Sequence, residues 1–361
     1  MSQATRYGLI LAGGRGTRFW PRSRAACAKQ VLRFLSERSL IQETVDRLKP
    51  VIPPKRLWII TSEVLRKEIV RQLPEVPAGQ ILAEPAPRNT APCIGLAARI
   101  IETIDPEAVF GVFPADHVIS RPTAYRKLLP AAFAEAAKGN IAVIGIKPRW
   151  AETGYGYIEF PKGTEAGETP KAVPVRRFRE KPDAALARRF VKAGHFYWNA
   201  GMFFWKASVV MEAMRKFQPS TAALLESLPP VGSKRFAEAL RKTFPLCQSI
   251  SIDYAVLEHA RNITGIPAGD IGWNDVGSWD AVYELLPKDA QANATRETDA
   301  MFETSMGNYV EAQGKLVALL GVRDLIVVDT PDALLIASRD RAQQVSDLVK
   351  RLEREGRKEL L

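Results

Sequence analysis

The chain has 361 residues, of which 46% are hydrophobic and 25% charged, and this is the composition of an ordinary globular protein long enough for two domains. A formal net charge of +11 indicates anionic partners, namely nucleic acid, a membrane surface or phosphorylated small molecules. No basic run alternates with aromatic residues and no apolar run approaches the roughly 20 residues that span a bilayer, so we expect neither nucleic-acid binding nor a membrane span.

Cysteine usage and the N-terminal residues indicate the compartment. The three cysteines are far apart and lack metal-binding spacing. The first residues do not form a basic segment followed by an apolar one, as a secretory signal would. We therefore expect a cytoplasmic protein in a reducing compartment.

A glycine-rich loop follows the first predicted element. Tyr7–Leu11 is an apolar run typical of a buried parallel strand. Three glycines lie within Gly13–Gly16, where several backbone N–H groups can converge on one anion. Arg15, Arg18 and Lys29 add positive charge suited to phosphate oxygens.

Two common nucleotide motifs are absent from this loop. It contains neither Gly-x-x-x-x-Gly-Lys-Ser/Thr nor Gly-x-Gly-x-x-Gly, so a P-loop kinase and a dinucleotide dehydrogenase are not supported. A glycine turn that only connects a strand to a helix is the alternative reading.

The stretch Leu11–Pro21, followed by Lys29-Gln30, resembles the signature of the sugar-nucleotide pyrophosphorylases and is most similar to the mannose-1-phosphate guanylyltransferase branch. The resemblance implies that Arg18 and Lys29 are catalytic and neutralise the transferring phosphates. It implies that the loop residues bind the nucleotide: Leu11, Ala12, Gly13, Gly14, Arg15, Gly16 and Thr17. Two positions depart from the family pattern, with Ala28 in place of proline and Arg22 in place of leucine.

Strand-like runs then alternate with amphipathic segments. The expected strands are Tyr7–Leu11, Leu57–Thr61, Ile81–Glu84, Val109–Phe113 and Ile141–Ile146, and the expected helices are Leu40–Leu48, Glu63–Leu73, Ala91–Ile104 and Tyr125–Lys138. This alternation predicts an α/β fold, and the resemblance makes it a Rossmann-like nucleotidyltransferase domain with a mixed, mostly parallel sheet. Ligands of such sheets bind at the carboxyl ends of the strands.

Polar residues follow the third expected strand. Asn89 or Thr90 is suited to cap the next helix, which by itself explains the pair. The resemblance implies a further role, in which Glu84, Pro85, Asn89 and Thr90 line the nucleobase pocket.

Two aspartates are the expected metal ligands. Asp116 follows the fourth strand beside the phosphate loop, where it is positioned to hold Mg²⁺. Asp275 is the second Mg²⁺ ligand by resemblance, although an aspartate in a turn is commonly only a turn residue. Phosphate nucleophiles are already ionised at neutral pH, so we assign His117 no catalytic role.

Sugar-phosphate contacts are expected from the middle of the chain. Gly154 lies in a glycine-aromatic turn, and its small size would let a sugar approach the backbone. The resemblance makes Glu180 the acceptor for sugar hydroxyls, Lys181 the partner of the phosphate and Asn199 a sugar contact. The alternatives are an exposed ion pair at 180 and 181 and an apolar core segment around Asn199. Pro182 is expected in the first turn of a helix, and the Ser251–Val256 block is expected to support the site.

From about residue 290 the pattern changes to short strands with turn residues between them. We expect a nucleotidyltransferase domain over 1–289 and a small β-helix-like domain with a closing helix over 290–361. The expected strands are Asn308–Glu311, Leu316–Leu320, Leu325–Val328 and Leu334–Ala337, and the helix is expected from Arg341 to about Glu355. This region is expected to serve packing or self-association, and we expect a homodimer.

The resulting hypothesis is that GTP and α-D-mannose 1-phosphate give GDP-mannose and pyrophosphate with Mg²⁺. The same chemistry with another sugar or base, a catalytically silent nucleotide-sugar binder, and a nucleic-acid-binding module are the alternatives. The chain has three histidines and no phosphomannose isomerase extension, so we expect it to be monofunctional.

Overall fold

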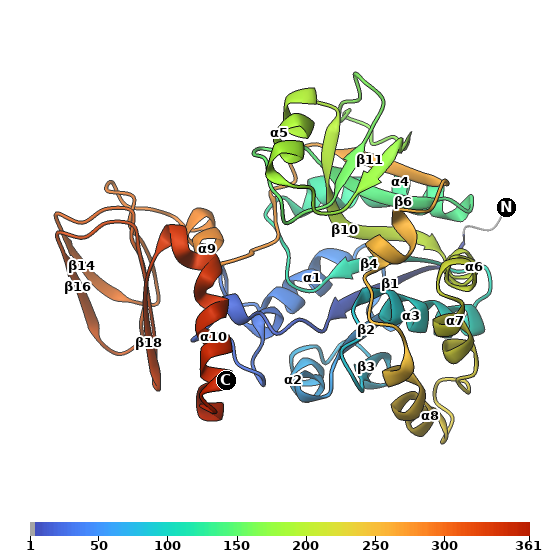
Figure 1. Ribbon diagram of the computed structural model, residues 1–361, viewed down its shortest axis with the longest axis horizontal. Coiled ribbons are helices and arrows are strands. Elements are labelled where there is room, and N and C mark those ends of the chain that lie inside the picture. Colours follow the sequence, from blue (N-terminus) through green and yellow to red (C-terminus); the bar gives the residue numbers. More distant parts are fainter. Residues whose placement is uncertain (1–3) are drawn as a thin grey trace. The chain divides into compact units, whose positions relative to one another are not determined.

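The computed structural model describes residues 4–361, which form two compact units (Figure 1). Unit 1 comprises residues 4–13, Thr44–Ala115 and Ile119–Trp273. Unit 2 comprises Gly14–Glu43, Asp116–Val118 and Asn274–Leu361. The chain therefore leaves unit 1 directly after Gly13 and again directly after Ala115.

A ten-stranded mixed sheet forms the centre of unit 1, in the order β3-β2-β1-β4-β10-β6-β11-β8 with β7 and β9 beside β10. Strands β3, β2, β1 and β4 are parallel, β10 runs antiparallel to β4 and β6, and β11 is parallel to β6. The strands are β1 Arg6–Ala12, β2 Leu57–Ser62, β3 Ile81–Glu84, β4 Val109–Pro114, β6 Ile141–Ile146, β7 Tyr157–Glu159, β8 Val173–Pro174, β9 Arg177–Arg179, β10 Phe196–Lys206 and β11 Ile263–Ala268.

Strand β1 lies between β2 and β4 and has almost no exposed side chain at Leu9 and Ile10. A strand that is covered on both faces is apolar throughout, which explains why the sequence predicts it well. Its last residues pair with Thr61 of β2 and Pro114 of β4, so the carboxyl ends of three strands meet at one edge. That edge is where open α/β sheets bind ligands.

Helices cover both faces of this sheet. Alternating aromatic residues of β10 face opposite ways: Phe204 contacts Phe133 of α4, whereas Phe203 and Trp205 belong to the core beneath α3 and α6. The helices are α1 Leu40–Leu48, α2 Glu63–Gln72, α3 Thr90–Ile104, α4 Pro122–Ala137, α5 Ala184–Ala193, α6 Ala207–Phe217, α7 Pro219–Glu226 and α8 Phe236–Thr243. Each of the helices expected before residue 140 is present, with bounds that differ by at most three residues.

Unit 2 contains parallel rungs like those of a β-helix. Strands β13, β15 and β17 stack in parallel, β14 and β16 form a second parallel pair, and β18 closes the first sheet as a hairpin with β17. The elements are β13 Ala294–Arg296, β14 Asp299–Glu303, β15 Tyr309–Glu311, β16 Leu316–Leu320, β17 Leu325–Thr330, β18 Ala333–Ser338, α9 Trp279–Leu285 and α10 Val345–Arg354. Two short strands, β5 (Val118–Ile119) and β12 (Trp273–Asn274), complete the set among the described residues. The predicted fold class is confirmed.

Several local expectations need correction. Pro182 is not in the first turn of α5, because Asp183 caps that helix by accepting a hydrogen bond from Leu186 N at 2.8 Å. The closing helix begins at Val345, because Arg339–Gln344 forms a 3-10 helix before it. The predicted domain boundary at 289 and 290 stays a prediction. Among residues 4–361 we find no helix with the length and apolar character needed to cross a bilayer.

Candidate active site

The glycine loop of unit 2 is packed against Lys29. Gly16 has φ 62°, and a Cβ there would lie 2.5 Å from Lys29 Cβ and 3.0 Å from its backbone nitrogen. Only glycine is therefore accommodated at this position. Two side chains hold the loop carbonyls, since Gln30 Nε2 donates to Gly14 O at 3.0 Å and Ser23 Oγ donates to Arg15 O at 3.0 Å.

Lys29 joins the two aspartates that the sequence proposes as metal ligands. It is 6% exposed, and Nζ donates to Asp116 Oδ2 at 2.9 Å and to the backbone oxygen of Asp275 at 2.6 Å. A buried ammonium group requires such oxygen partners. Lys29, Asp116, Asp275 and the glycine loop are thus brought together within unit 2.

The charge on Asp116 is stabilised by its neighbours. Burial opposes ionisation of this carboxyl group, but Lys29 and His117 outweigh burial and lower the pKa of Asp116. The group is therefore a carboxylate at neutral pH, as a metal ligand must be. His117 Nε2 lies 4.0 Å from Asp116 Oδ1.

Arg18 lies beside Asp275. Its Nη1 is 3.5 Å, and Asp275 Oδ2 is 3.2 Å, from the point where a Cβ on Gly277 would stand. The same Nη1 donates to Gln343 Oε1 at 2.7 Å. Arg15 instead pairs with Glu353 of α10 at 2.8 Å, and both side chains of that pair are exposed. Thr17 begins the 3-10 helix Thr17–Phe19 that ends the loop.

The expected nucleobase residues lie in unit 1, at the carboxyl ends of β1 and β3. A Cβ on Gly13, which follows Leu11 and Ala12, would stand 2.6 Å from Glu84 Oε1. Cys93 Sγ donates to Glu84 Oε2 at 3.2 Å, and burial raises the pKa of Glu84. The carboxyl group of Glu84 therefore packs against Gly13, where β1 leads into the glycine loop. Pro85 continues the chain from Glu84.

Asn89 has the capping role that the sequence offered as the alternative, and Thr90 is the first residue of the helix. Asn89, at φ 64°, accepts a hydrogen bond from Thr90 N at 2.8 Å and caps α3. Thr90 Oγ1 accepts from Ile252 N at 2.9 Å, which ties α3 to the Ser251–Val256 block. These hydrogen bonds fix both residues at the start of α3.

The expected sugar residues form a buried polar cluster in unit 1. Glu180 and Asn199 are 8% and 9% exposed, and both lie against Gly156, where a Cβ would be 2.5 Å from Glu180 Oε2 and 3.3 Å from Asn199 Cβ. Lys181 Nζ contacts Glu180 Oε1 at 3.2 Å. Gly154 lies apart from these contacts, with its N–H donating to Glu152 Oε1 at 2.8 Å.

Asp253 also belongs to this cluster. From the sequence we expected only that its segment, Ser251–Val256, supports the site. Asp253 Oδ1 accepts a hydrogen bond from Asn199 Nδ2 at 3.1 Å, and Asn199 Oδ1 accepts from Gly201 N at 3.2 Å, so the amide is held at both ends. Burial, and next the charge of Glu180, raise the pKa of Asp253 to about 7. An aspartate inside the apolar run Ile252–Leu257 was the available signal.

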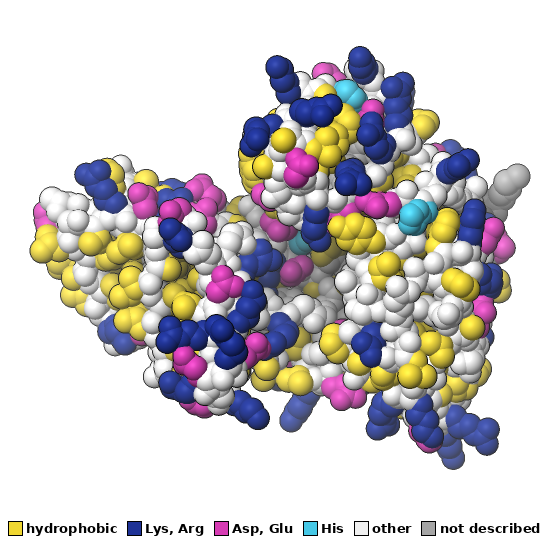
Figure 2. Space-filling model, in the orientation of Figure 1, with side chains coloured by type: hydrophobic (Ala, Val, Ile, Leu, Met, Phe, Trp, Pro, Cys, Tyr) yellow, Lys and Arg dark blue, Asp and Glu magenta, His cyan; other side chains and the backbone are white. Residues whose placement is uncertain are grey.

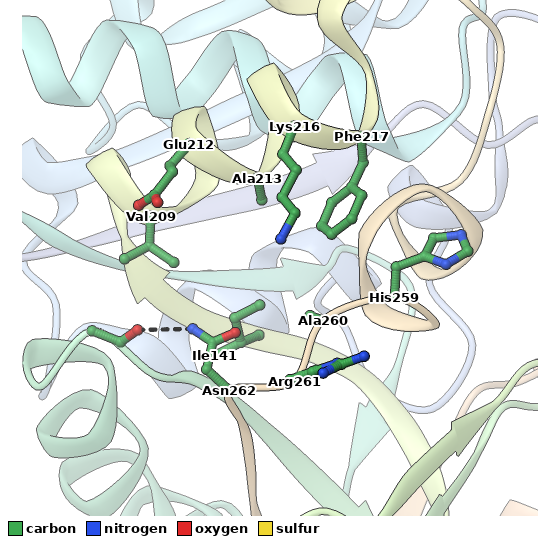
Figure 3. Close-up of a pocket in the computed structure, with 11 residues that line it drawn as sticks. Ile141, Val209, Glu212, Ala213, Lys216, Phe217, His259, Ala260, Arg261 and Asn262 are labelled. Atoms are coloured by element: carbon green, nitrogen blue, oxygen red, sulfur yellow. Dashed lines mark hydrogen bonds between the residues drawn. The ribbon is translucent and has the colours of Figure 1, made fainter.

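A pocket of unit 1 is lined by none of the predicted site residues. Its volume is about 760 Å³, and its lining includes Lys216 and Phe217 of α6 together with His259 and Arg261 (Figure 3). Among residues 4–361, no cluster of three or more histidine, cysteine, aspartate or glutamate side chains is arranged to hold a metal ion.

Comparison with known proteins identifies the family. Residues 7–292 match the family model described as nucleotidyl transferase, and residues 303–352 match the MannoseP isomerase/GMP-like beta-helix domain. The chain therefore belongs to the nucleotidyl transferase family, and it is an enzyme of that class.

Individual relatives indicate the branch of the family to which the chain is most similar. The chain is 35% identical to the mannose-1-phosphate guanylyltransferase of Escherichia coli K12, over 99% of this chain and 76% of that protein. It is 38% identical to the xanthan biosynthesis protein XanB of Xanthomonas campestris, over 97% of this chain and 74% of that protein. A crystal structure from Thermus thermophilus, described as mannose-1-phosphate geranyltransferase, has a TM-score of 0.85 and 32% identity, with coverage of 97% of this chain and 99% of the other. The resemblance to the guanylyltransferase branch is confirmed.

Proposed function

We propose that the chain transfers the guanylyl group of GTP to α-D-mannose 1-phosphate, giving GDP-mannose and pyrophosphate. The names of its relatives support the substrates. The observation that carries the chemistry is the position of Lys29, whose buried ammonium group donates to Asp116 and to the backbone of Asp275 while its own backbone packs against Gly16. A fixed cation beside a glycine loop is suited to a triphosphate.

The loop residues take the triphosphate in this proposal. A Cβ on Gly14 would stand in open space, and its φ is not in the left-handed region, so neither packing nor backbone geometry explains this glycine. Close approach of a phosphate does explain it. Leu11, Ala12, Gly13, Arg15, Gly16 and Thr17 bind the nucleotide with it, and Glu84, Pro85, Asn89 and Thr90 line the base pocket.

The polar cluster of unit 1 takes the sugar phosphate. Glu180 accepts hydrogen bonds from sugar hydroxyls, Lys181 pairs with the phosphate and Asn199 orients the ring, with Gly154 contributing backbone. Burial of Glu180 and Asn199 supports this assignment, because desolvated polar groups discriminate strongly between substrates that satisfy them and those that do not.

Mg²⁺ fits the donor set at Asp116 and Asp275. Mg²⁺ prefers hard oxygen ligands and commonly takes one or two carboxylates, with phosphate oxygens and water completing the shell. Asp116 is ionised at neutral pH, as its lowered pKa requires. When bound, the metal would supply neutralisation of phosphate charge.

The reaction needs position and charge more than a base. A phosphate oxygen of mannose 1-phosphate forms a bond to the α-phosphorus, while the bond from that phosphorus to the bridging oxygen of pyrophosphate breaks. Lys29 and Arg18 stabilise the negative charge that grows on the phosphate oxygens, each contributing on the order of 3 kcal/mol. The sugar phosphate is already ionised and gives up no proton at the attacking oxygen.

The test is pyrophosphate release by the pure protein with a panel of nucleoside triphosphates and hexose 1-phosphates. We expect GTP with mannose 1-phosphate to have the highest kcat/KM, and EDTA to stop release until Mg²⁺ is restored in excess. A higher kcat/KM for another base or sugar would transfer the proposal to that pair. Absence of release from every pair would contradict catalysis and favour the silent binder.

The compartment and the oligomeric state are also part of the proposal. We infer a cytoplasmic enzyme, in keeping with three cysteines that form no disulfide bond within the described part of the chain, and a homodimer. Exposed apolar side chains on β14, β16 and β18 support association (Figure 2), and they are Met301, Leu316, Leu320, Leu334 and Ile336. Patches of this kind commonly mark protein–protein contacts.

A further inference from the structure

Arg22 is one of the two positions that depart from the family signature. It follows Trp20-Pro21, in the segment that continues the glycine loop, and stands where the family pattern has leucine. Its side chain is 22% exposed, so the charged group is largely removed from water. A buried guanidinium group needs an anionic partner from elsewhere in the fold.

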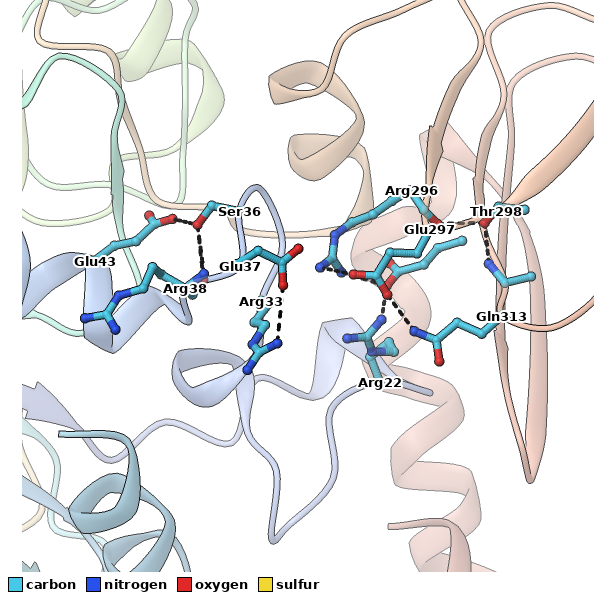
Figure 4. A network of polar contacts seen from close by, with 12 residues as sticks. Arg22, Arg33, Ser36, Glu37, Arg38, Glu43, Arg296, Glu297, Thr298 and Gln313 are labelled. Atoms are coloured by element: carbon cyan, nitrogen blue, oxygen red, sulfur yellow. Dashed lines mark hydrogen bonds and ion pairs between the residues drawn. The ribbon is translucent and has the colours of Figure 1, made fainter. Parts of the chain in front are cut away.

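That partner is Glu311 on β15, whose side chain is 2% exposed. Figure 4 shows Arg22 and Arg296 in the polar network around it. Glu311 Oε1 accepts hydrogen bonds from Arg22 and, at 3.0 Å, from Arg296 Nη1. Its Oε2 accepts from Tyr309 OH at 2.6 Å. One buried carboxylate of the β-helix-like domain therefore binds the segment that carries the glycine loop.

Arg22 is joined to the loop through its neighbour. Ser23 is 5% exposed, its N–H donates to Phe19 O at 2.9 Å, and its hydroxyl donates to Arg15 O at 3.0 Å. A displacement of Arg22 therefore moves the group that holds the carbonyl between Gly14 and Gly16. The next residue of the loop, Gly16, packs closely against Lys29.

We propose that Arg22 and Glu311 are positioning residues that hold the glycine loop in the conformation that binds the triphosphate. Neither touches a reacting atom; each acts through Ser23 and the Arg15 carbonyl. The proposal rests on the proposed function in that the loop binds GTP. It gives the C-terminal strands a role in the reaction that the sequence alone did not indicate.

Arg22→Leu is the sharpest variant, because it restores the family residue and leaves Glu311 with its bonds from Arg296 and Tyr309. Loss of a preorganised loop should weaken GTP binding more than the chemical step. We expect the KM for GTP to rise about tenfold, with kcat and the KM for mannose 1-phosphate within about twofold of the original. Arg22→Lys keeps a cation opposite Glu311 and should restore most of the affinity.

Asp332→Asn is the matched control. Arg24, two residues along the same segment, pairs with Asp332 through Nη2 at 3.0 Å, and the Asp332 side chain is 47% exposed. The carboxylate of this pair is exposed to water, unlike that of Glu311, so its loss should cost little and every kinetic constant should stay within about twofold. An equal rise in the KM for GTP in this variant would show that any weakening of the segment has the same effect, and would overturn the specific role of Glu311.

Hydrogen exchange measured by mass spectrometry separates this proposal from the proposed function. In Arg22→Leu, amides of residues 14–19 should exchange at least about fivefold faster at an unchanged Tm, and those of Asp332→Asn should not. Unchanged exchange in Arg22→Leu overturns the proposal whatever the activity, as does faster exchange with an unchanged KM for GTP. Lack of pyrophosphate release by the original protein would instead contradict the proposed function. The exchange rates would still show whether Arg22 and Glu311 hold the glycine loop.

Discussion

Lys29 is the residue on which the proposed chemistry depends most. Its ammonium group is buried, yet Asp116 and the Asp275 carbonyl supply two short hydrogen bonds, and the ring of Phe19 lies 5.7 Å from Nζ. The missing proline at position 28 does not leave the lysine loosely placed, because Ala28 is fully buried and Gly16 packs on the Lys29 backbone. The packing of Ala28 and Gly16 therefore holds Lys29 in place, as the fixed φ of a proline at position 28 would.

Lys29→Ala should lower kcat by roughly 100-fold or more, because a preorganised cation at the transferring phosphates is lost. Steady-state pyrophosphate release measures this, and circular dichroism should show an unchanged fold. Lys49→Ala is the control, since Lys49 also forms an ion pair, with Asp46 at 2.9 Å, but has no proposed contact with substrate. A Lys29→Ala enzyme with near-normal kcat would remove Lys29 from the mechanism.

At the scale of elements, two irregular segments build the sugar cluster. Strand β10 shifts register between Asn199 and Phe203, and Gly201 there has φ 67°. Asp253 begins a single π-helical turn, Asp253–Leu257, after Ile252. Bulges and π-turns commonly occur where a strand or helix must turn one polar side chain toward a site. The hydrogen bond from Asn199 to Asp253 joins these two irregular segments.

Asp253→Asn should change how stability depends on pH. The pKa of Asp253 is about 7 in the folded protein, whereas an unfolded aspartate titrates near about 3.9, so between these values the folded state binds more protons. The free energy of unfolding therefore falls as pH rises from about 4 to about 7. Asparagine removes this term and still accepts the hydrogen bond from Asn199.

Urea unfolding at pH 5 and pH 8 tests this directly. The loss of stability between the two pH values should be about 2 to 3 kcal/mol smaller in Asp253→Asn than in the original protein. Asp347→Asn, which changes an exposed acid on α10 to the same amide, is the control. Parallel pH profiles of the original protein and Asp253→Asn would contradict a raised pKa at this position.

At the scale of the whole molecule, Gly14, Gly16 and the two aspartates that we propose bind the metal belong to the same compact unit as the C-terminal strands. The predicted boundary at residue 290 follows the change in sequence pattern, whereas compactness follows contacts. Contacts group residues 14–43 with 274–361 because Trp279 packs on Phe19 and Phe34, and Glu311 binds Arg22. The C-terminal domain is therefore bound to the loop that we propose binds GTP.

Leu320→Lys should shift the protein from a dimer toward a single chain of 40.0 kDa, measured by light scattering at micromolar concentration. Leu320 is 73% exposed on β16, and a charge there opposes burial in an apolar contact. Leu246→Lys, which changes a residue 70% exposed in unit 1, is the control and should leave the mass unchanged. A single-chain mass for the original protein would contradict the proposed homodimer.

By itself the sequence determined the elements whose period or composition is set locally. Strands β1 to β4 and helix α3 consist mainly of apolar residues because other elements cover them. A run of apolar residues bounded by glycine, proline or polar residues therefore predicts them. The glycine loop could likewise be read, because glycines and cations adjacent in the chain imply phosphate binding without knowledge of the fold.

Only the tertiary structure decided which distant residues meet. The Lys29 contacts with Asp116 and Asp275, the hydrogen bond of Asn199 to Asp253, and the Arg22 pairing with Glu311 join positions between 54 and 289 residues apart in sequence. No local pattern specifies such pairs, because a buried charge is stabilised by whichever opposite charge the fold brings beside it. The contacts of Asp253 and Glu311 could therefore be found only in the tertiary structure.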